Sequence, residues 1–197
     1  DLSDGEARDS LGNTTLRAVI EHINNLGGAH QITFGVSGDI ALEASLPPIV
    51  PTVEIDGRGA DGDRIRLTRS PTATSTVGLA LSFAGAQSTI RNFADISISL
   101  LVGSDGSRVE GNYTGVSRDG LTARGGGISV YSSGNTIGGV TEAARNVTTG
   151  IYVTGSTNTI IGNHVGVTAD GTLALAGMST ISGGVQVTDG ADNRIGG

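Results

Sequence analysis

The sequence predicts an all-β fold made of stacked, repeated short strands, a β-solenoid, with one capping helix at its start. Segments related to residues 150–171 recur before and after that stretch, and self-similarity of this kind is the signature of a repeat architecture. Glycine is frequent, at 33 of 197 residues, whereas aromatic residues make up only 3%. Frequent turns and small apolar side chains favour narrow stacked strands over a compact helical domain.

Residues 1–30 are expected to form a polar lead-in followed by an N-terminal capping helix. Thr14 or Thr15 can serve as the N-cap, and Gly27 with Gly28 supplies a C-terminal stop. We therefore expect a helix at about 15–26 that covers the first coil of the solenoid. The apolar positions between these signals have the spacing of one helix face: Leu16, Val19, Ile20, Ile23 and Leu26.

Residues 31–197 are expected to form the coils of the solenoid. Apolar residues alternate with polar ones in short runs, as at Ile32 and Phe34 or at Val53 and Ile55, and these runs are separated by Gly, Pro, Asp or Ser. Such a pattern is typical of short strands between tight turns. The prolines at 47, 48 and 51 lack the backbone donor that an interior strand needs, so they predict a corner or an edge crossing.

Two apolar columns become visible when the repeats after Gly78 are aligned, and each is expected to face the interior. The first column consists of pairs: Leu79/Leu81, Ile98/Leu100, Ile128/Val130, Ile151/Val153 and Val185/Val187. The second column consists of single residues: Ile90, Val109, Ile137, Ile160 and Ile195. Stacking would bury these columns continuously, although one coil alone has too little apolar surface to fold.

A small polar residue stands two positions before each member of the second column. Serine and asparagine side chains bond neighbouring backbone groups in turns, and asparagine tolerates a left-handed conformation. These positions are therefore predicted to form a stacked turn: Ser88, Ser107, Asn135, Asn158 and Asn193.

The length of one coil is about 19–23 residues, as the intervals from Ile90 to Val109 and from Ile137 to Ile160 show. Longer intervals predict loop insertions at about 113–126 and 166–183. These two insertions begin alike, because the pattern Gly-Asn-x-x-Gly-Val-Ser/Thr-x-Asp-Gly starts at Gly111 and again 51 residues later at Gly162.

Composition argues against several classes of partner. Twelve basic residues against nineteen acidic ones give a net charge of −7, which disfavours nucleic acid and anionic membranes. All twelve basic residues are arginine and there is no cysteine, so lysine chemistry, disulfides and thiolate metal sites are excluded. No apolar run approaches the roughly 18 residues that a membrane-spanning helix needs, so membrane insertion is not expected.

Several motifs of the chain resemble those of the bacterial right-handed parallel β-helix repeat proteins. The cap-helix segment 13–25 and the strands at 31–34 and 53–57 are similar to the N-terminal module of that family. Residues 135–139 (NTIGG), 144–147 (ARNV) and 161–166 resemble its later repeats. The resemblance implies a right-handed parallel β-helix in a secreted or cell-surface bacterial protein. Members of the family include adhesin-like and structural modules as well as polysaccharide lyases, epimerases and glycoside hydrolases.

The most acidic stretch is residues 56–63, where Asp56, Asp61 and Asp63 could supply oxygen ligands to Ca²⁺. Arg58 and Arg64 would compete for these carboxylates, and neither an EF-hand loop nor a nonapeptide calcium repeat is present. Aspartate beside glycine is ordinary turn chemistry. We therefore assign no catalytic, cofactor or metal residue, and Ca²⁺ stays open. Turn roles are also expected for the later acids: Asp119, Asp170, Asp189 and Asp192.

These observations favour a non-enzymatic structural or adhesive module of a bacterial surface or secreted protein. The expected partners are further coils of the same chain, or a second copy joined through the last coil into a fibre. Polysaccharide is the remaining partner to consider. The competing hypothesis is a carbohydrate-active enzyme or a glycan-binding module that uses the lateral groove, for which Tyr113, Tyr131 and Tyr152 are the only tyrosines available to stack on sugar rings.

Overall fold

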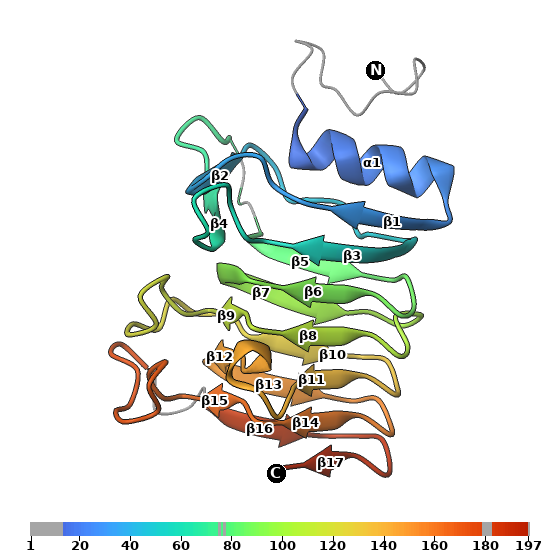
Figure 1. Cartoon of the computed structure of the whole chain (residues 1–197). Helices are drawn as coiled ribbons and strands as arrows, with labels where there is room; N and C mark the ends of the chain where they lie inside the picture. The colour runs from blue at the N-terminus through green and yellow to red at the C-terminus, as the bar shows by residue number, and fades with distance from the viewer. Residues whose placement is uncertain (1–13, 75, 77, 179–182, 197) are drawn as a thin grey trace.

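The computed structural model describes residues 14–74, 76, 78–178 and 183–196 as stacked parallel strands below one helix (Figure 1). The helical elements are α1 (Leu16–Leu26) and the single 3₁₀ turn η1 (Glu142–Ala144). The strands are β1 (Ala29–Ile32), β2 (Asp39–Leu42), β3 (Thr52–Asp56), β4 (Ile65–Arg69), β5 (Ala80–Phe83), β6 (Thr89–Arg91), β7 (Phe93–Leu100), β8 (Arg108–Glu110), β9 (Tyr113–Thr114), β10 (Ile128–Val130), β11 (Thr136–Gly138), β12 (Val147–Thr148), β13 (Gly150–Val153), β14 (Thr159–Ile161), β15 (His164–Val165), β16 (Gly184–Val187) and β17 (Arg194–Ile195).

The helix α1 forms where the apolar spacing predicted it and lies above β1 (Figure 1). Thr15 is the N-cap, because its hydroxyl accepts a hydrogen bond from the Ala18 N–H at 3.1 Å. Gly27 ends the helix with a φ of 65°, and its N–H donates to the Ile23 carbonyl at 3.0 Å. No helix in the described part of the chain is long and apolar enough to cross a membrane.

The strands form two parallel sheets, which present three faces because one strand bends between two of them. Face A is the sheet β1-β3-β6-β8-β11-β14-β17. The first half of β7 pairs with β4 and β9, whereas its second half pairs with β5 and β10. Face B therefore holds β2, β4, the start of β7, β9, β12 and β15, and face C holds β5, the end of β7, β10, β13 and β16. We call one strand from each of faces A, B and C, taken in chain order, a layer.

The core is a set of apolar columns that run through the layers. The predicted second column lies on face A and begins earlier than expected, because Ile32 pairs with Ile55 and Ile55 with Ile90. All members are buried except Ile195, which is 52% exposed in the last layer. Each fully buried aliphatic side chain contributes about 1.5–3 kcal/mol relative to an exposed one. In register order the column is Ile32, Ile55, Ile90, Val109, Ile137, Ile160 and Ile195.

Two sequence-based assignments were wrong. The first column on face C begins with Leu81 and Phe83 rather than Leu79 and Leu81, because Leu81 pairs with Ile98 and the buried Phe83 fills the interior position beside Leu100. The segment 113–126 is also not wholly an insertion. Its first residues form β9 on face B, and the loop begins only at Gly115.

The corner between faces C and A carries the stacked turn that the sequence predicted. Each side-chain oxygen accepts a hydrogen bond from the backbone N–H of the equivalent residue one layer earlier. The Ser107 hydroxyl accepts from the Ser88 N–H at 3.0 Å, and the amide oxygens of Asn135, Asn158 and Asn193 each continue the series at 2.9 Å. Because four of these side chains are almost fully buried, this ladder fixes the vertical register of the layers.

A second ladder, which the sequence analysis missed, occupies the corner between faces A and B. The Asn112 oxygen accepts from the Phe93 N–H at 3.0 Å, the Asn146 oxygen from the Asn112 N–H at 2.9 Å, and the Asn163 oxygen from the Asn146 N–H at 3.4 Å. The three amide groups also donate to carbonyls of the layer before. Two corners of each central layer are thus held by buried side-chain hydrogen bonds.

Candidate functional site

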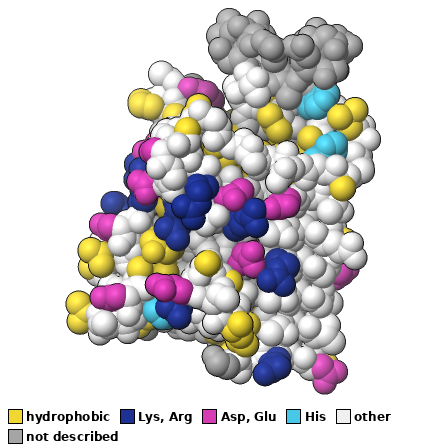
Figure 2. All heavy atoms as spheres, in the orientation of Figure 1, with side chains coloured by type: hydrophobic (Ala, Val, Ile, Leu, Met, Phe, Trp, Pro, Cys, Tyr) yellow, Lys and Arg dark blue, Asp and Glu magenta, His cyan; other side chains and the backbone are white. Residues whose placement is uncertain are grey.

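The predicted calcium stretch begins at the end of β3, where Asp56 is part of an ion-pair group on face A. Arg91 donates to Asp56 at 2.9 Å and to Glu54 at 2.6 Å, and the Asn92 amide donates to Asp56 at 2.8 Å. Burial of the Asp56 carboxyl opposes ionisation, but these hydrogen bonds outweigh it and hold the pKa of Asp56 below its ordinary value. Figure 2 shows acidic and basic groups side by side across this face.

The other two acids of this stretch lie in the turn that follows. The Asp61 carboxylate accepts a hydrogen bond from the Asp63 N–H at 3.0 Å, and this bond lowers the pKa of Asp61. Within the described residues, no three acidic or histidine side chains converge as a metal-binding group. The structure therefore leaves Asp56 engaged with arginine and places Asp61 in the turn role that the sequence predicted for aspartate beside glycine.

Asp119 and Asp170 lie at equivalent positions in the two loops that share the 51-residue repeat. Each carboxylate accepts a hydrogen bond from the hydroxyl two residues earlier, on Ser117 or Thr168, and another from the backbone N–H two residues later. Both acids therefore act within their own loops. The two loops also meet directly, because Thr122 and Ala176 form a parallel bridge across the short corner of the layer between them.

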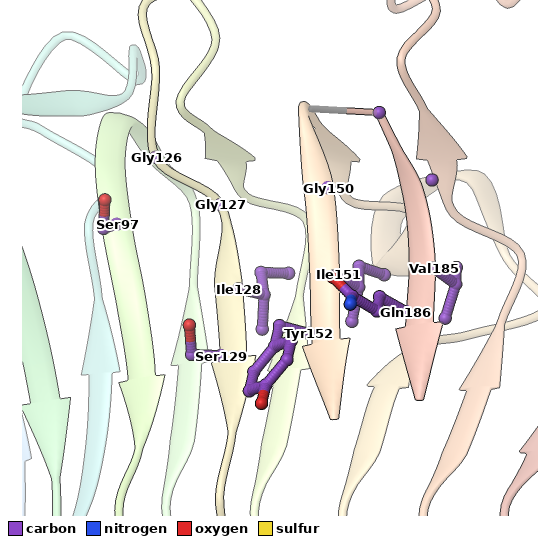
Figure 3. A pocket seen from close by; sticks show the side chains of 12 residues that line it. Ser97, Gly126, Gly127, Ile128, Ser129, Gly150, Ile151, Tyr152, Val185 and Gln186 are labelled. Carbon is purple, nitrogen blue, oxygen red and sulfur yellow. The ribbon is translucent and has the colours of Figure 1, made fainter. Parts of the chain in front are cut away.

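An open groove of about 550 Å³ runs across the outer surface of face C, beside these loops. Figure 3 shows the Tyr152 ring between Ser129 and Gln186, which come from three neighbouring strands. Glycines lie at the starts of β10, β13 and β16, and their lack of side chains deepens the groove along that margin. The described residues that line it are Ser97, Gly126, Gly127, Ile128, Ser129, Gly150, Ile151, Tyr152, Gly183, Gly184, Val185 and Gln186.

The three tyrosines have different surroundings. Tyr131 and Tyr152 are neighbours, with ring centroids 6.0 Å apart, and the Tyr152 hydroxyl accepts a hydrogen bond from Thr188. Tyr113 lies on face B, where the Arg64 guanidinium stacks over its ring at 3.9 Å. Of the three, Tyr152 lines the groove and Tyr131 lies next to it.

The groove offers hydroxyl, amide and aromatic groups, which suit a neutral polar ligand such as a sugar. None of the described lining residues carries a carboxylate, imidazole or guanidinium, and the phenol of Tyr152 is the group among them that could serve as a general acid or base. Sequence reasoning had named Tyr152 and a lateral groove but not the residues that line it, because the lining depends on which outward positions of four strands become neighbours. No protein-family model, curated protein or solved structure matches the chain.

Proposed function

We propose that the chain is a right-handed parallel β-helix that serves as a rigid, non-enzymatic structural or adhesive module of a bacterial surface or secreted protein. The observation that carries this proposal is the continuity of the ladder between faces C and A. It joins five successive layers from Ser88 to Asn193 without a gap. Buried and fully bonded polar networks rigidify a structure and specify a single register.

The surface charges also support a structural role. Asp56, which the sequence offered as a ligand, is paired with Arg91 on face A, and two other acids of that face are also paired, in the contacts of Arg91 with Glu54 and of Arg108 with Glu110. The pairs of Arg91 link β6 to the neighbouring strand β3, whereas Arg108 and Glu110 both belong to β8. The resemblance to the β-helix repeat proteins supplies the handedness and the extracellular bacterial location that the proposal includes.

Rigidity can be tested by measuring distances between spin labels along face A. The chain has no cysteine, so Gln31→Cys with Arg194→Cys gives two unique labels on exposed side chains of the first and last strands of the face. These strands are six steps apart, which corresponds to about 29 Å at roughly 4.8 Å per strand. The matched pair Gln31→Cys with Thr136→Cys spans four steps, or about 19 Å.

A stacked rigid module predicts two narrow distance distributions whose centres differ by two strand spacings. Broad distributions, or equal distances for the two pairs, would remove the support for a spacer. Because both pairs share the label on β1, local mobility at that position would broaden both distributions equally and can be recognised.

End-to-end association is the second part of this proposal. In the described part of the chain, β16 and β17 are the outermost strands of their sheets, and Val187 and Ile195 are 39% and 52% exposed. Exposed strand edges of this kind recruit further strands. Light scattering across a concentration series should show mass increasing with concentration, and Ile195→Lys should reduce that increase. A constant monomer mass would count against self-association.

A glycan-binding module is the second candidate, because the groove on face C places Tyr152 among serine and glutamine side chains (Figure 3). The test is titration with a panel of neutral and acidic polysaccharides, together with an assay for released reducing ends or unsaturated products. Binding without product, lost in Tyr152→Ala and kept in Arg108→Ala on face A, would favour the binding module. Product formation would favour the enzyme hypothesis instead.

A further inference from the structure

A second depression, of about 540 Å³, lies where face B meets the loop that follows β9. It is distinct from the groove on face C, since no residue is shared between the two linings. Three of the twelve arginines of the chain converge here. The described lining residues are Asp63, Arg66, Ser117, Arg118, Asp119 and Arg124.

Two of the arginines share one carboxylate. Arg66 binds Asp39 through both its Nε, at 3.1 Å, and a terminal nitrogen, and Arg118 donates to the same carboxylate at 2.8 Å. The pKa of Asp39 is held below its ordinary value, chiefly by the hydrogen bond from Arg66. The Asp39 carboxylate thus accepts three hydrogen bonds from the two arginines. Each guanidinium group still has N–H donors that Asp39 does not bind.

One buried donor of this group has no partner within the described part of the chain. The Arg118 Nε is buried and has no hydrogen-bond partner there, although a buried donor without a partner costs about 1–3 kcal/mol. Arg124 also lines the depression and is exposed; its guanidinium forms no hydrogen bond or ion pair with any described residue, although its charge acts on the Asp95 carboxyl. The Asp119 carboxylate accepts its hydrogen bonds from Ser117 and Leu121 in its own loop, and the charge of Arg124 also acts on it.

Asp95, whose backbone conformation is strained, is a second carboxylate partner of Arg66. Asp95 lies at a register shift in β7 and has a φ of 54°, in the left-handed region that non-glycine residues rarely adopt. Its carboxylate lies 3.6 Å from Arg66. β-Bulges are frequent next to functional sites, where they redirect a side chain, and here the irregularity turns Asp95 toward Arg66 and keeps that guanidinium in place.

We propose that Arg66, Arg118 and Arg124 form a binding site for an oxyanion, either a free anion or the carboxylate or sulfate group of a larger ligand. Guanidinium groups bind planar and tetrahedral oxyanions through paired, charge-assisted hydrogen bonds. A bound oxyanion would satisfy the buried Arg118 donor and pair Arg124. This proposal does not depend on the proposed rigid module, because it concerns a different surface of the protein.

The experiment is a titration of the ¹⁵N-labelled chain, followed through the arginine Nε–H signals at constant ionic strength. The probes are sulfate, phosphate and glucuronate, with galactose as the uncharged control. Sulfate should move the Arg118 and Arg124 signals in a saturable manner, whereas Arg108, which is paired with Glu110 on face A, should stay. Tighter binding of glucuronate than of sulfate would identify the carboxylate of a saccharide as the ligand group. Equal binding of the two would identify a free anion as the ligand.

Two variants make the proposal falsifiable. Arg124→Gln should weaken binding by about tenfold or more, the effect of losing a charged hydrogen-bond donor, and Arg108→Gln should leave it unchanged. Arg118→Lys keeps the charge but loses the paired donors, so it should also weaken binding while the backbone spectrum shows an intact fold. Absence of saturable shifts at Arg118 and Arg124 with every anion, or unchanged affinity in Arg124→Gln, would overturn the site.

Discussion

The corner between faces C and A and the corner between faces B and C are built on opposite rules. At the first, each layer from the third to the last described one begins with a short turn that carries a serine or asparagine, which is buried in all but the last. At the second, β7 passes without any loop, a single residue, Thr149, separates β12 from β13, and long loops follow β9 and β15. The first corner joins one layer to the next, whereas the second lies within a layer.

The difference shows which corner fixes the register of the stacked layers. The first corner cannot change length, because each side-chain oxygen must reach the N–H of the residue one layer away. Among the described residues the second corner has no such ladder, so its loops vary in length and support one another instead. The bridge between Thr122 and Ala176 and the small apolar cluster around Val116, Val147 and Leu175 are that support. The arginine group of the proposed anion site belongs to this variable corner.

The largest effect is expected from breaking the constant corner with Asn158→Ala. The Asn158 oxygen accepts from both the backbone and the side-chain N–H of Asn135, and its amide donates to the Ser132 carbonyl. Removing it leaves two buried donors and one acceptor unsatisfied, which should lower the free energy of unfolding by roughly 3 kcal/mol. Urea denaturation followed by circular dichroism measures this loss.

Asn158→Ser is the matched control, because serine already fills this position at Ser88 and Ser107. It keeps a hydroxyl acceptor for the Asn135 N–H and should cost clearly less than the alanine variant. A loss below about 1 kcal/mol in Asn158→Ala would mean that water replaces the side chain, and the corner would no longer explain the register.

The same corner explains how much of the fold the sequence could predict. The ladder and the face A column were visible because their spacing is locally regular, and α1 because its caps flank an apolar face. The later part of face B was missed because β9, β12 and β15 have two residues each, too few to show a period. The pairing of Arg91 with Asp56 and the depression around Arg118 depend on register between distant layers, which no local pattern contains.

Substitutions at the left-handed position before each ladder residue should change the free energy of unfolding less, and in opposite directions for the two variants below. Gly134 and Thr157 occupy it in consecutive layers with φ of 70° and 57°. An L-residue pays about 1–2 kcal/mol there, so Gly134→Ala should lose about 1 kcal/mol. Thr157→Gly should gain a little less, because glycine also loses more entropy on folding. Effects of equal sign in the two variants would contradict the shared backbone role.

The two partly buried aspartates outside the constant corner should give opposite pH dependence. Hydrogen bonds from Asn92 and Arg91 outweigh the burial of Asp56 and keep its pKa below 3.8, so its stabilisation is present above that pH and is lost as the pH falls through the folded value. Burial raises the pKa of Asp95 above 3.8 despite Arg66, so the folded state loses stability as the pH rises through that window. Denaturation midpoints measured from acid to neutral pH test both signs.

At neutral pH, Asp56→Asn should therefore lower stability and Asp95→Asn should raise it. Below the folded pKa of Asp56 its variant should match the parent chain. If Asp95→Asn instead destabilises the neutral protein, the ion pair with Arg66 outweighs burial, and Asp95 is a structural partner rather than a tolerated strain.

The smallest effect is expected at the loop turns of the variable corner. Asp119→Ala removes a carboxylate that is exposed and bonds only Ser117 and Leu121 within its own loop. Water can replace those contacts, so the urea midpoint should stay within experimental error of the parent chain, and Asp170→Ala should behave alike. A loss as large as that of Asn158→Ala would show that the loops also hold the register, and the contrast between the two corners would then be one of length alone.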